Sequence, residues 1–126
     1  MNYSDVVNTL SRSGIDVAQP GAKPGICTSP YVVVQNAGTY RYAQSAGLGY
    51  TLVSVHCYTP LYAYEQLMIL IERVKSALRC LEPDLRYAGN EAVHIINDSF
   101  RANEGSVQYL IQRSLTPPDS ERNSEE

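Results

Sequence analysis

The stretch Tyr50–Cys80, YTLVSVHCYTPLYAYEQLMILIERVKSALRC, decides the fold, because a strand pattern in it passes directly into a helix pattern. Within Tyr50–Tyr58, the apolar residues Val53, Val55 and Cys57 alternate with more polar neighbours. This two-residue period predicts a strand with one face on the core, as in an antiparallel sheet covered on one side.

The second half of the stretch predicts a long amphipathic helix over about 60–80, with the usual uncertainty at its ends. Thr59 followed by Pro60 is typical of an N-cap and a first helical residue, and Pro83 follows the end of the pattern. One side of the helix is apolar, with Leu67, Leu70, Ile71, Val74, Ala77, Leu78 and Leu81. The other side carries Glu65, Glu72, Arg73, Lys75 and Arg79, which a solvated helix face explains.

Upstream of this stretch the sequence predicts a short helix, a loop and a hairpin. Tyr3–Ser13 has helical spacing, with Ser4 as its N-cap and a glycine after its end. Ile15–Ser29 is rich in glycine and proline and is predicted to be a loop. Strands are expected at Tyr31–Gln35 and Thr39–Tyr42, separated by a turn at Asn36–Gly38, with a flexible hairpin tip at Gln44–Gly49.

Downstream, Ala92–Phe100 and Ser106–Leu115 are predicted as a closing hairpin around a turn at Asn103–Gly105. The expected fold is therefore α+β: a small antiparallel or mixed sheet, the long helix packed on one face, and the short N-terminal helix. Residues 1–115 form the predicted domain. The acidic end, residues 116–126, is predicted to be disordered.

Charge and composition argue for protein partners. The formal net charge is -3, and the body before Thr116 is neutral, because the end of the chain holds the excess acid. A neutral body argues against nucleic-acid binding, which needs a basic stripe. Charged residues make up only 18% of the chain, so much of its surface is neutral polar or aromatic, unlike that of most free monomers.

No metal, cofactor, catalytic or membrane site is predicted. The three cysteines, Cys27, Cys57 and Cys80, lack disulfide or zinc spacing, which favours a reducing compartment. The longest apolar stretch is far too short to span a bilayer, and we expect no export signal. His56 and Cys57 are strand neighbours and so point to opposite faces. His94 and Asp98 lie roughly 13 Å apart along a strand, too far for a hydrogen bond.

The chain has ten tyrosines, one phenylalanine and no tryptophan. Tyrosine is enriched at protein interfaces, although tyrosines at the edge of a small core would explain the pattern equally well. Six of them are expected around the hairpin and the start of the long helix: Tyr40, Tyr42, Tyr50, Tyr58, Tyr62 and Tyr64. The candidate interface residues are Tyr40, Tyr42, Gln44, Leu48, Tyr50, Tyr62, Tyr64, Gln108 and Gln112.

This layout resembles the tail terminator family of long-tailed bacteriophages, also called tail completion or tail-to-head joining proteins. The resemblance is carried by Pro30–Val34, by a second strand ending in Val55–Tyr58, by Glu65 early in a long helix, and by a closing hairpin. It covers about Tyr3–Leu115. The glycine-rich segment Ala43–Gly49 and the acidic end depart from the family layout.

The resemblance implies a structural virion protein made in the host cytoplasm. Such a subunit forms a ring, commonly a hexamer, that caps the tail tube and joins it to the head. Its partners are other copies of itself, the tail tube protein and a neck or head completion protein. It implies no catalytic residue and no cofactor. Two alternatives stay open: another neck subunit, such as a head completion or minor capsid protein, and a small ligand-binding or enzymatic domain using His56 or His94.

Overall fold

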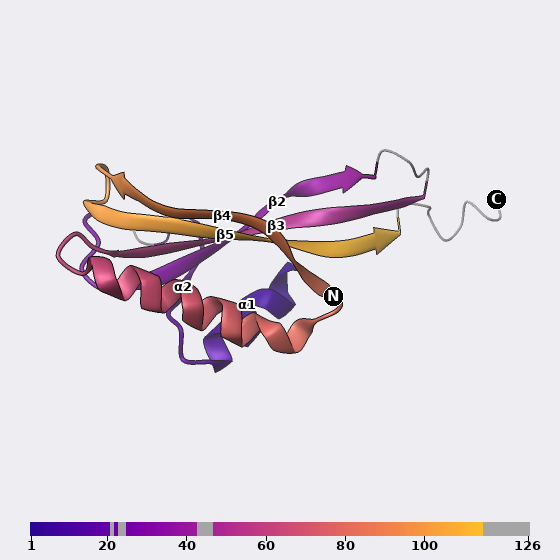
Figure 1. Ribbon diagram of the computed structural model, residues 1–126, viewed down its shortest axis with the longest axis horizontal. Helices are drawn as coiled ribbons and strands as arrows, with labels where there is room; N and C mark the ends of the chain where they lie inside the picture. The colour runs from indigo at the N-terminus through magenta and orange to yellow at the C-terminus, as the bar shows by residue number, and fades with distance from the viewer. Residues whose placement is uncertain (21, 23–24, 43–46, 115–126) are drawn as a thin grey trace.

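A computed structural model describes residues 1–20, 22, 25–42 and 47–114. Their strands form one five-stranded mixed sheet in the order β1-β2-β3-β5-β4, with both α-helices on one face (Figure 1). The strands are β1 Val17–Ala18, β2 Tyr31–Arg41, β3 Leu48–Pro60, β4 Leu85–Asn97 and β5 Ala102–Ser114. The helices are α1 Tyr3–Arg12, α2 Tyr64–Leu78 and the short 3-10 helix η1 Arg79–Leu81.

The α+β class, the mixed sheet and the two helices are confirmed, but the sheet is larger than the small one expected. β3, β4 and β5 each have 13 residues and β2 has 11. β3 lies between β2 and β5 and pairs antiparallel with both, while β4 pairs antiparallel with β5. β1, which lies within the predicted loop, runs parallel to β2 at Val32 and Val33 only. The rest of β2 is therefore an edge among the described strands.

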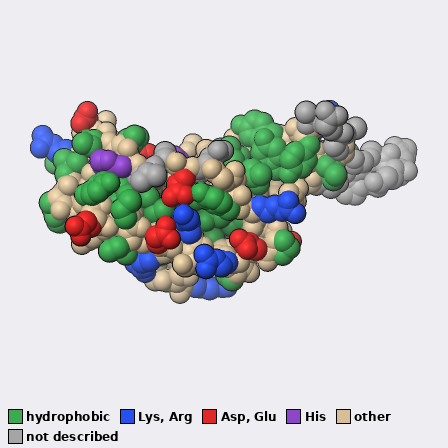
Figure 2. Space-filling model, in the orientation of Figure 1, with side chains coloured by type: hydrophobic (Ala, Val, Ile, Leu, Met, Phe, Trp, Pro, Cys, Tyr) green, Lys and Arg blue, Asp and Glu red, His purple; other side chains and the backbone are tan. Residues whose placement is uncertain are grey.

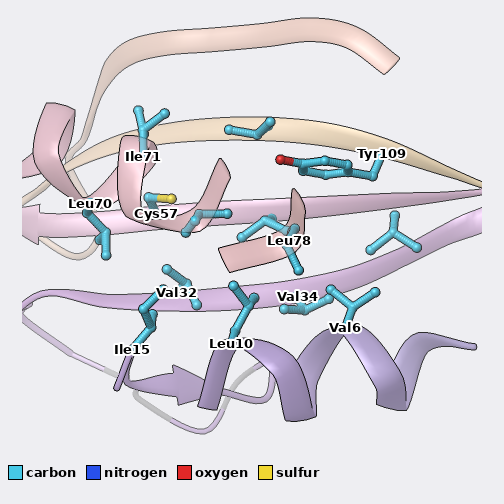
Figure 3. Packing of buried hydrophobic residues seen from close by; sticks show 14 of the residues in the cluster. Val6, Leu10, Ile15, Val32, Val34, Cys57, Leu70, Ile71, Leu78 and Tyr109 are labelled. Carbon is cyan, nitrogen blue, oxygen red and sulfur yellow. The ribbon is translucent and has the colours of Figure 1, made fainter. Parts of the chain in front are cut away.

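The core lies between the helices and the inner face of the sheet. Val53, Val55 and Cys57 of β3 are completely buried, as their alternation predicted, and pack in one cluster with Leu10 of α1 and Leu70 of α2 (Figure 3). Burying one such side chain stabilises the fold by about 1.5–3 kcal/mol. This cluster fixes which face of the sheet the helices cover.

The beginning of the long helix was predicted wrongly. Thr59 and Pro60 belong to β3, opposite Asn103 and Ala102 of β5. α2 begins four residues later than Pro60, at Tyr64, without a side-chain cap. The local Thr-Pro signal is overridden because β5 pairs with β3 up to its last residue. Together with η1, the helical segment ends at Leu81, close to the predicted end.

Two other local predictions also fail. Asn2, and not Ser4, caps α1: its Oδ1 accepts from the Asp5 amide at 3.3 Å, and the Asp5 carboxylate accepts from the Asn2 amide at 2.7 Å. The predicted turn at Asn103–Gly105 lies inside β5, and the chain instead turns between Asn97 and Ala102. The position of the turn is again determined by pairing with β3, because a turn at Gly105 would shorten the β3–β5 ladder.

β2 is one strand with a bulge where a turn was expected. Between the pairs Asn36–Val53 and Thr39–Thr51, β2 has one extra residue, and Gly38 adopts a φ of +106° that favours glycine. The Gly38 amide donates to Asn36 Oδ1 at 2.9 Å, and the Tyr40 hydroxyl donates to the Ala37 carbonyl at 2.8 Å. Side chains thus form hydrogen bonds with backbone groups of this edge strand.

A second cluster covers one end of the outer face of the sheet. Tyr31 and Tyr58, directly opposite on β2 and β3, stack at 5.1 Å between ring centroids. Cys27 and Phe100 belong to the same cluster, and the Cys27 amide donates to the Phe100 carbonyl at 2.7 Å. The segment after β1 therefore reaches the turn between β4 and β5. Residues 43–46, which include the first half of the predicted hairpin tip, and the end of the chain (115–126) lie outside the described residues.

Candidate functional site

Three tyrosines meet at the end of the sheet where β3 begins. Tyr40 lies directly opposite Tyr50, with 5.6 Å between ring centroids, and Tyr42 lies 5.2 Å from Tyr50. The Tyr42 amide donates to the Leu48 carbonyl at 3.1 Å, which places Leu48 beside them. We call Tyr40, Tyr42, Leu48 and Tyr50 the hairpin patch. Figure 2 shows apolar side chains gathered where β2 ends and β3 begins.

The hairpin patch is ordered by hydrogen bonds but remains accessible. The Tyr42 hydroxyl donates to Gln112 Oε1 of β5 at 3.2 Å, which connects the patch to a third strand. Leu48 is 57% exposed and Tyr40 46% exposed. An apolar, aromatic surface held by its own hydrogen bonds is the kind of surface that binds another protein.

A second apolar surface lies at the opposite end of the sheet. Tyr62 is 86% exposed, and Leu61 and Tyr64 beside it are also exposed. The Asn103 side-chain amide donates to the carbonyls of Pro60 and Leu61 at 3.0 and 3.3 Å. Ile96 of β4, the strand partner of Asn103, is exposed next to them. We call Leu61, Tyr62, Tyr64 and Ile96 the turn patch.

His94 belongs to the surroundings of the turn patch. Its ring lies edge-on to Tyr64 at 4.7 Å, and its Nε2 lies 2.9 Å from Asn103 Oδ1. The side chain is exposed. Its hydrogen-bonding partner is thus Asn103 on β5, across the hairpin.

The structure separates residues that the sequence grouped together. Tyr50 lies near the beginning of β3 and Tyr62 follows its end. At normal strand rise the two residues are roughly 30 Å apart. Tyr58 is buried in the second cluster and belongs to neither patch. Gln108 lies mid-sheet, where its side-chain amide donates to Ser54 Oγ at 3.4 Å. Gln44 is outside the described residues.

The two ends carry opposite charge. Among residues 38–42, 47–52 and 109–114, the charged side chains are Arg41, which is exposed, and Arg113, which donates to Thr51 Oγ1 at 2.9 Å. Asp84 and Arg86 beside them carry opposite signs. Residues 61–66 and 94–104 at the other end carry Glu65, Asp98 and Glu104 against Arg101. The hairpin end thus has two arginines, both opposite Gly49 and so on the other face of the sheet from Tyr40 and Tyr50, and the turn end is acidic.

Cys57 lies in the core. Burial raises the pKa of its thiol to about 12, so at neutral pH it is protonated and poorly nucleophilic. His56 points to the outer face, where its Nδ1 lies 3.4 Å from the Glu104 carboxylate and its Nε2 lies 3.1 Å from Gln35 Oε1. The opposite orientation of these neighbours agrees with the prediction from strand geometry, and the two side chains cannot act together.

A groove of about 650 Å³ lies between the end of α1 and the exposed side of α2. Its walls are mainly apolar, with Ile15, Met68 and Ile69, and Glu72 and Arg73 lie at its rim. Arg73 Nη2 lies 3.4 Å from the Ser13 carbonyl and 3.5 Å from the Gly14 carbonyl. The guanidinium thus interacts with the negative end of α1.

One polar cluster was not predicted from the sequence. Tyr87 donates to Glu91 Oε2 at 2.7 Å, and Lys75 of α2 lies 3.2 Å from the same oxygen. The hydrogen bond from Tyr87, with that from Lys75, lowers the pKa of Glu91, and the bond to Glu91 raises the pKa of Tyr87. The cluster depends on extra residues in β4 between Tyr87 and Glu91, at Gly89. The sequence gives no local signal for that irregularity.

Within residues 1–20, 22, 25–42 and 47–114, no group of three or more histidine, cysteine, aspartate or glutamate residues could hold a metal ion. No helix in this part of the chain has the length and apolar character needed to cross a membrane. The absence of catalytic and cofactor-binding residues stays a prediction.

Comparison with known proteins adds no further restriction on the function of these surfaces. No protein-family model matches the chain, and no curated protein matches it at a significant level.

Proposed function

We propose that this chain is a tail terminator subunit of a long-tailed bacteriophage. In this role it forms a ring, commonly a hexamer, that caps the tail tube and joins it to the head or neck in the virion. The order of elements supports the proposal: an N-terminal helix, two long antiparallel strands, an amphipathic helix and a closing hairpin follow the layout of that family.

The observation that carries the proposal is the presence of two unlike apolar patches at opposite ends of one sheet. The hairpin patch contains the exposed Tyr40 and Leu48, and the turn patch contains the exposed Leu61, Tyr62 and Tyr64. A closed ring needs two different surfaces on every subunit, because each copy contacts one neighbour with each. A subunit with one patch would instead form pairs.

A ring leaves other surfaces free for the tail tube protein and for a neck or head completion protein. The groove between α1 and α2 is one such surface, because it lies between the two ends and combines apolar walls with Glu72 and Arg73 at its rim. A head completion or minor capsid subunit would have the same requirements. The position of the protein in an imaged virion separates these roles.

The test is to image the purified protein alone and with tubes assembled from tail tube protein. We expect closed rings in electron micrographs and density at one end of each tube, together with tubes of arrested length. Tubes that keep growing and bear no density at either end would contradict the tail terminator role. Location at the portal side of the neck, away from the tube, would favour the alternative neck subunit.

A further inference from the structure

We propose that the acidic segment 116–126 of this chain binds to a pair of arginines, Arg41 and Arg113, on the helix-covered face of the sheet. The ligand is a carboxylate-bearing stretch of the same polypeptide. The proposal uses neither apolar patch and does not depend on the tail terminator role.

Strand pairing brings the two arginines together. Arg41 of β2 and Arg113 of β5 are both direct partners of Gly49 in β3, so the three residues form one row across the sheet. Gly49 is four residues from the buried Val53, and residues at even spacing in a strand share a face. Two strand spacings separate the Cα atoms of the arginines by roughly 10 Å. Because Gly49 has no side chain, the middle strand places nothing between the two guanidinium groups in this row.

Neither arginine is neutralised by a described residue. Arg113 Nε donates to Thr51 Oγ1 at 2.9 Å, and its Nη1 donates to the Met1 carbonyl at 2.7 Å. Both acceptors are uncharged, and the two bonds use only part of the donor set of a guanidinium. Arg41 is exposed. In the part of the chain that the structure describes, no carboxylate forms an ion pair with either arginine, so the row retains its positive charge.

The chain itself supplies the carboxylates. Residues 116–126 hold four acidic side chains against Arg122, so this segment carries the whole formal charge of -3. β5 ends at Ser114, directly after Arg113. Asp119 follows Arg113 by six residues, a stretch that spans at most about 20 Å, against roughly 10 Å between the two arginines. The first carboxylates of the segment are therefore within reach of both arginines.

Two physical effects favour this ligand. A guanidinium forms its strongest hydrogen bonds with carboxylates, often two at once. The covalent connection also keeps the carboxylates near the site, at an effective concentration on the order of millimolar. Bound there, the segment would lie on the face of the sheet opposite Tyr40 and Tyr50 and would leave the hairpin patch uncovered.

Carbodiimide cross-linking of the full chain tests the contact, because this reagent joins a carboxylate directly to a lysine amine. Arg41→Lys supplies the amine at the site and keeps the positive charge. Arg86→Lys is the matched control: Arg86 is also exposed and lies at the same end of the sheet, but its partner Leu110 is on the outer face. Lys75, which lies 3.2 Å from the Glu91 carboxylate, is the internal positive control in both variants.

Mass spectrometry quantifies the joined peptides. We expect cross-links from position 41 to Asp119 or Glu121 to be at least about tenfold more abundant than cross-links from position 86 to the same residues, because proximity of opposite charges decides the yield. Adding Arg113→Gln should reduce them severalfold. They should also be lost in about 1 M salt, where the screening length is about 3 Å.

A mixture of isotopically labelled and unlabelled protein identifies the copy that supplies the segment. Cross-links within one copy join peptides of the same isotope, as the proposal requires, and mixed-isotope pairs would reject it in favour of contact between copies. Equal yields at positions 41 and 86 would overturn the proposal. So would yields at position 41 that are unaffected by Arg113→Gln and by salt, or a missing cross-link at position 41 when the Lys75–Glu91 cross-link is present.

Discussion

Two pairs of tyrosines lie on the same face of the same two strands but differ in how deeply they are buried. Tyr31 and Tyr58 are direct partners across β2 and β3, and so are Tyr40 and Tyr50. Their ring centroids are 5.1 and 5.6 Å apart. Tyr58 is only 9% exposed, whereas Tyr40 is five times more accessible at 46%.

The difference lies in what covers each pair. Cys27 and Phe100 lie over the first pair and come from segments far apart in the sequence. Nothing among the described residues does the same for Tyr40. Strand sequence alone therefore does not decide whether a tyrosine is core or surface. At one end of the sheet the tyrosines contribute to folding, and at the other Tyr40 is accessible to solvent.

The largest loss of stability is expected when the covered pair, Tyr31 and Tyr58, is broken. Tyr58→Ala should lower the free energy of unfolding by about 3 kcal/mol, because truncating a buried aromatic side chain removes packing and leaves a cavity. Urea denaturation measures the loss. An unchanged slope of the unfolding free energy against urea concentration would show that the native state remains compact. A loss below about 1 kcal/mol would mean that Tyr58 is covered much less well than its burial indicates.

The next largest loss of stability is expected at alkaline pH, where the covered pair ionises. Burial, assisted by the charge of Glu104, raises the pKa of Tyr58 to about 12 from its ordinary value of 10.0. The folded state therefore keeps a proton that the unfolded chain loses, so this contribution is complete below pH 10 and is lost as the pH rises toward 12.

The measurement is the free energy of unfolding at several pH values between 10 and 12, for the unmodified protein and for Tyr58→Phe. The variant should lose stability less steeply, because it has no hydroxyl to titrate. Some slope should remain, since burial also raises the pKa of Cys57 to about 12. Equal slopes for the two proteins would show that the Tyr58 hydroxyl ionises as readily as a tyrosine in solution.

A smaller effect is expected where α2 is linked to β4. Glu91→Gln should cost about 1 kcal/mol at neutral pH, the upper range for partly exposed ion pairs. Because hydrogen bonds from Tyr87 and Lys75 lower the pKa of Glu91, this stabilisation is present above pH 4.5 and is lost as the pH falls through the lowered pKa. The difference between variant and unmodified protein should therefore shrink in acid.

Glu72→Gln is the control for that measurement, since Glu72 also contacts Lys75, at 3.4 Å, but its side chain is 72% exposed. Its stability should be nearly unchanged at either pH. If both variants lose the same amount, general charge and not the Glu91 contacts would account for the effect.

The smallest effect on folding should come from the uncovered pair. Tyr40→Ala should lower the free energy of unfolding by about 0.5 kcal/mol, the usual contribution of one cross-strand aromatic pair on an exposed face. A loss as large as that of Tyr58→Ala, measured in the same urea titration, would contradict the separation between a folding pair and a binding pair.

The sequence predicted those parts of the fold that depend on local periodicity. The alternation in β3 and the apolar side of α2 each need only neighbouring residues, and both were found. Pro60 was misassigned to a helix because its strand partner, Ala102, is distant in the sequence. The turn between β4 and β5 was misplaced for the same reason.

The candidate surfaces were predicted only in part. The sequence identified Tyr40, Tyr50 and Tyr62 as unusual, because an excess of tyrosine is visible in composition. It could not show that they belong to two ends of the sheet, or that Tyr58 between them is buried. Burial depends on Cys27 and Phe100, whose approach to Tyr58 has no sequence signature.

The bulge in β2 has a consequence for how copies of this chain can meet. Asn36 accepts from the Gly38 amide and Tyr40 donates to the Ala37 carbonyl, and a kinked edge resists extension of the sheet. At this edge copies would therefore meet through side chains and not by strand pairing, whereas β4 forms the other edge of the described sheet. Association of copies by adding a strand to β2 is therefore disfavoured, even at high protein concentration.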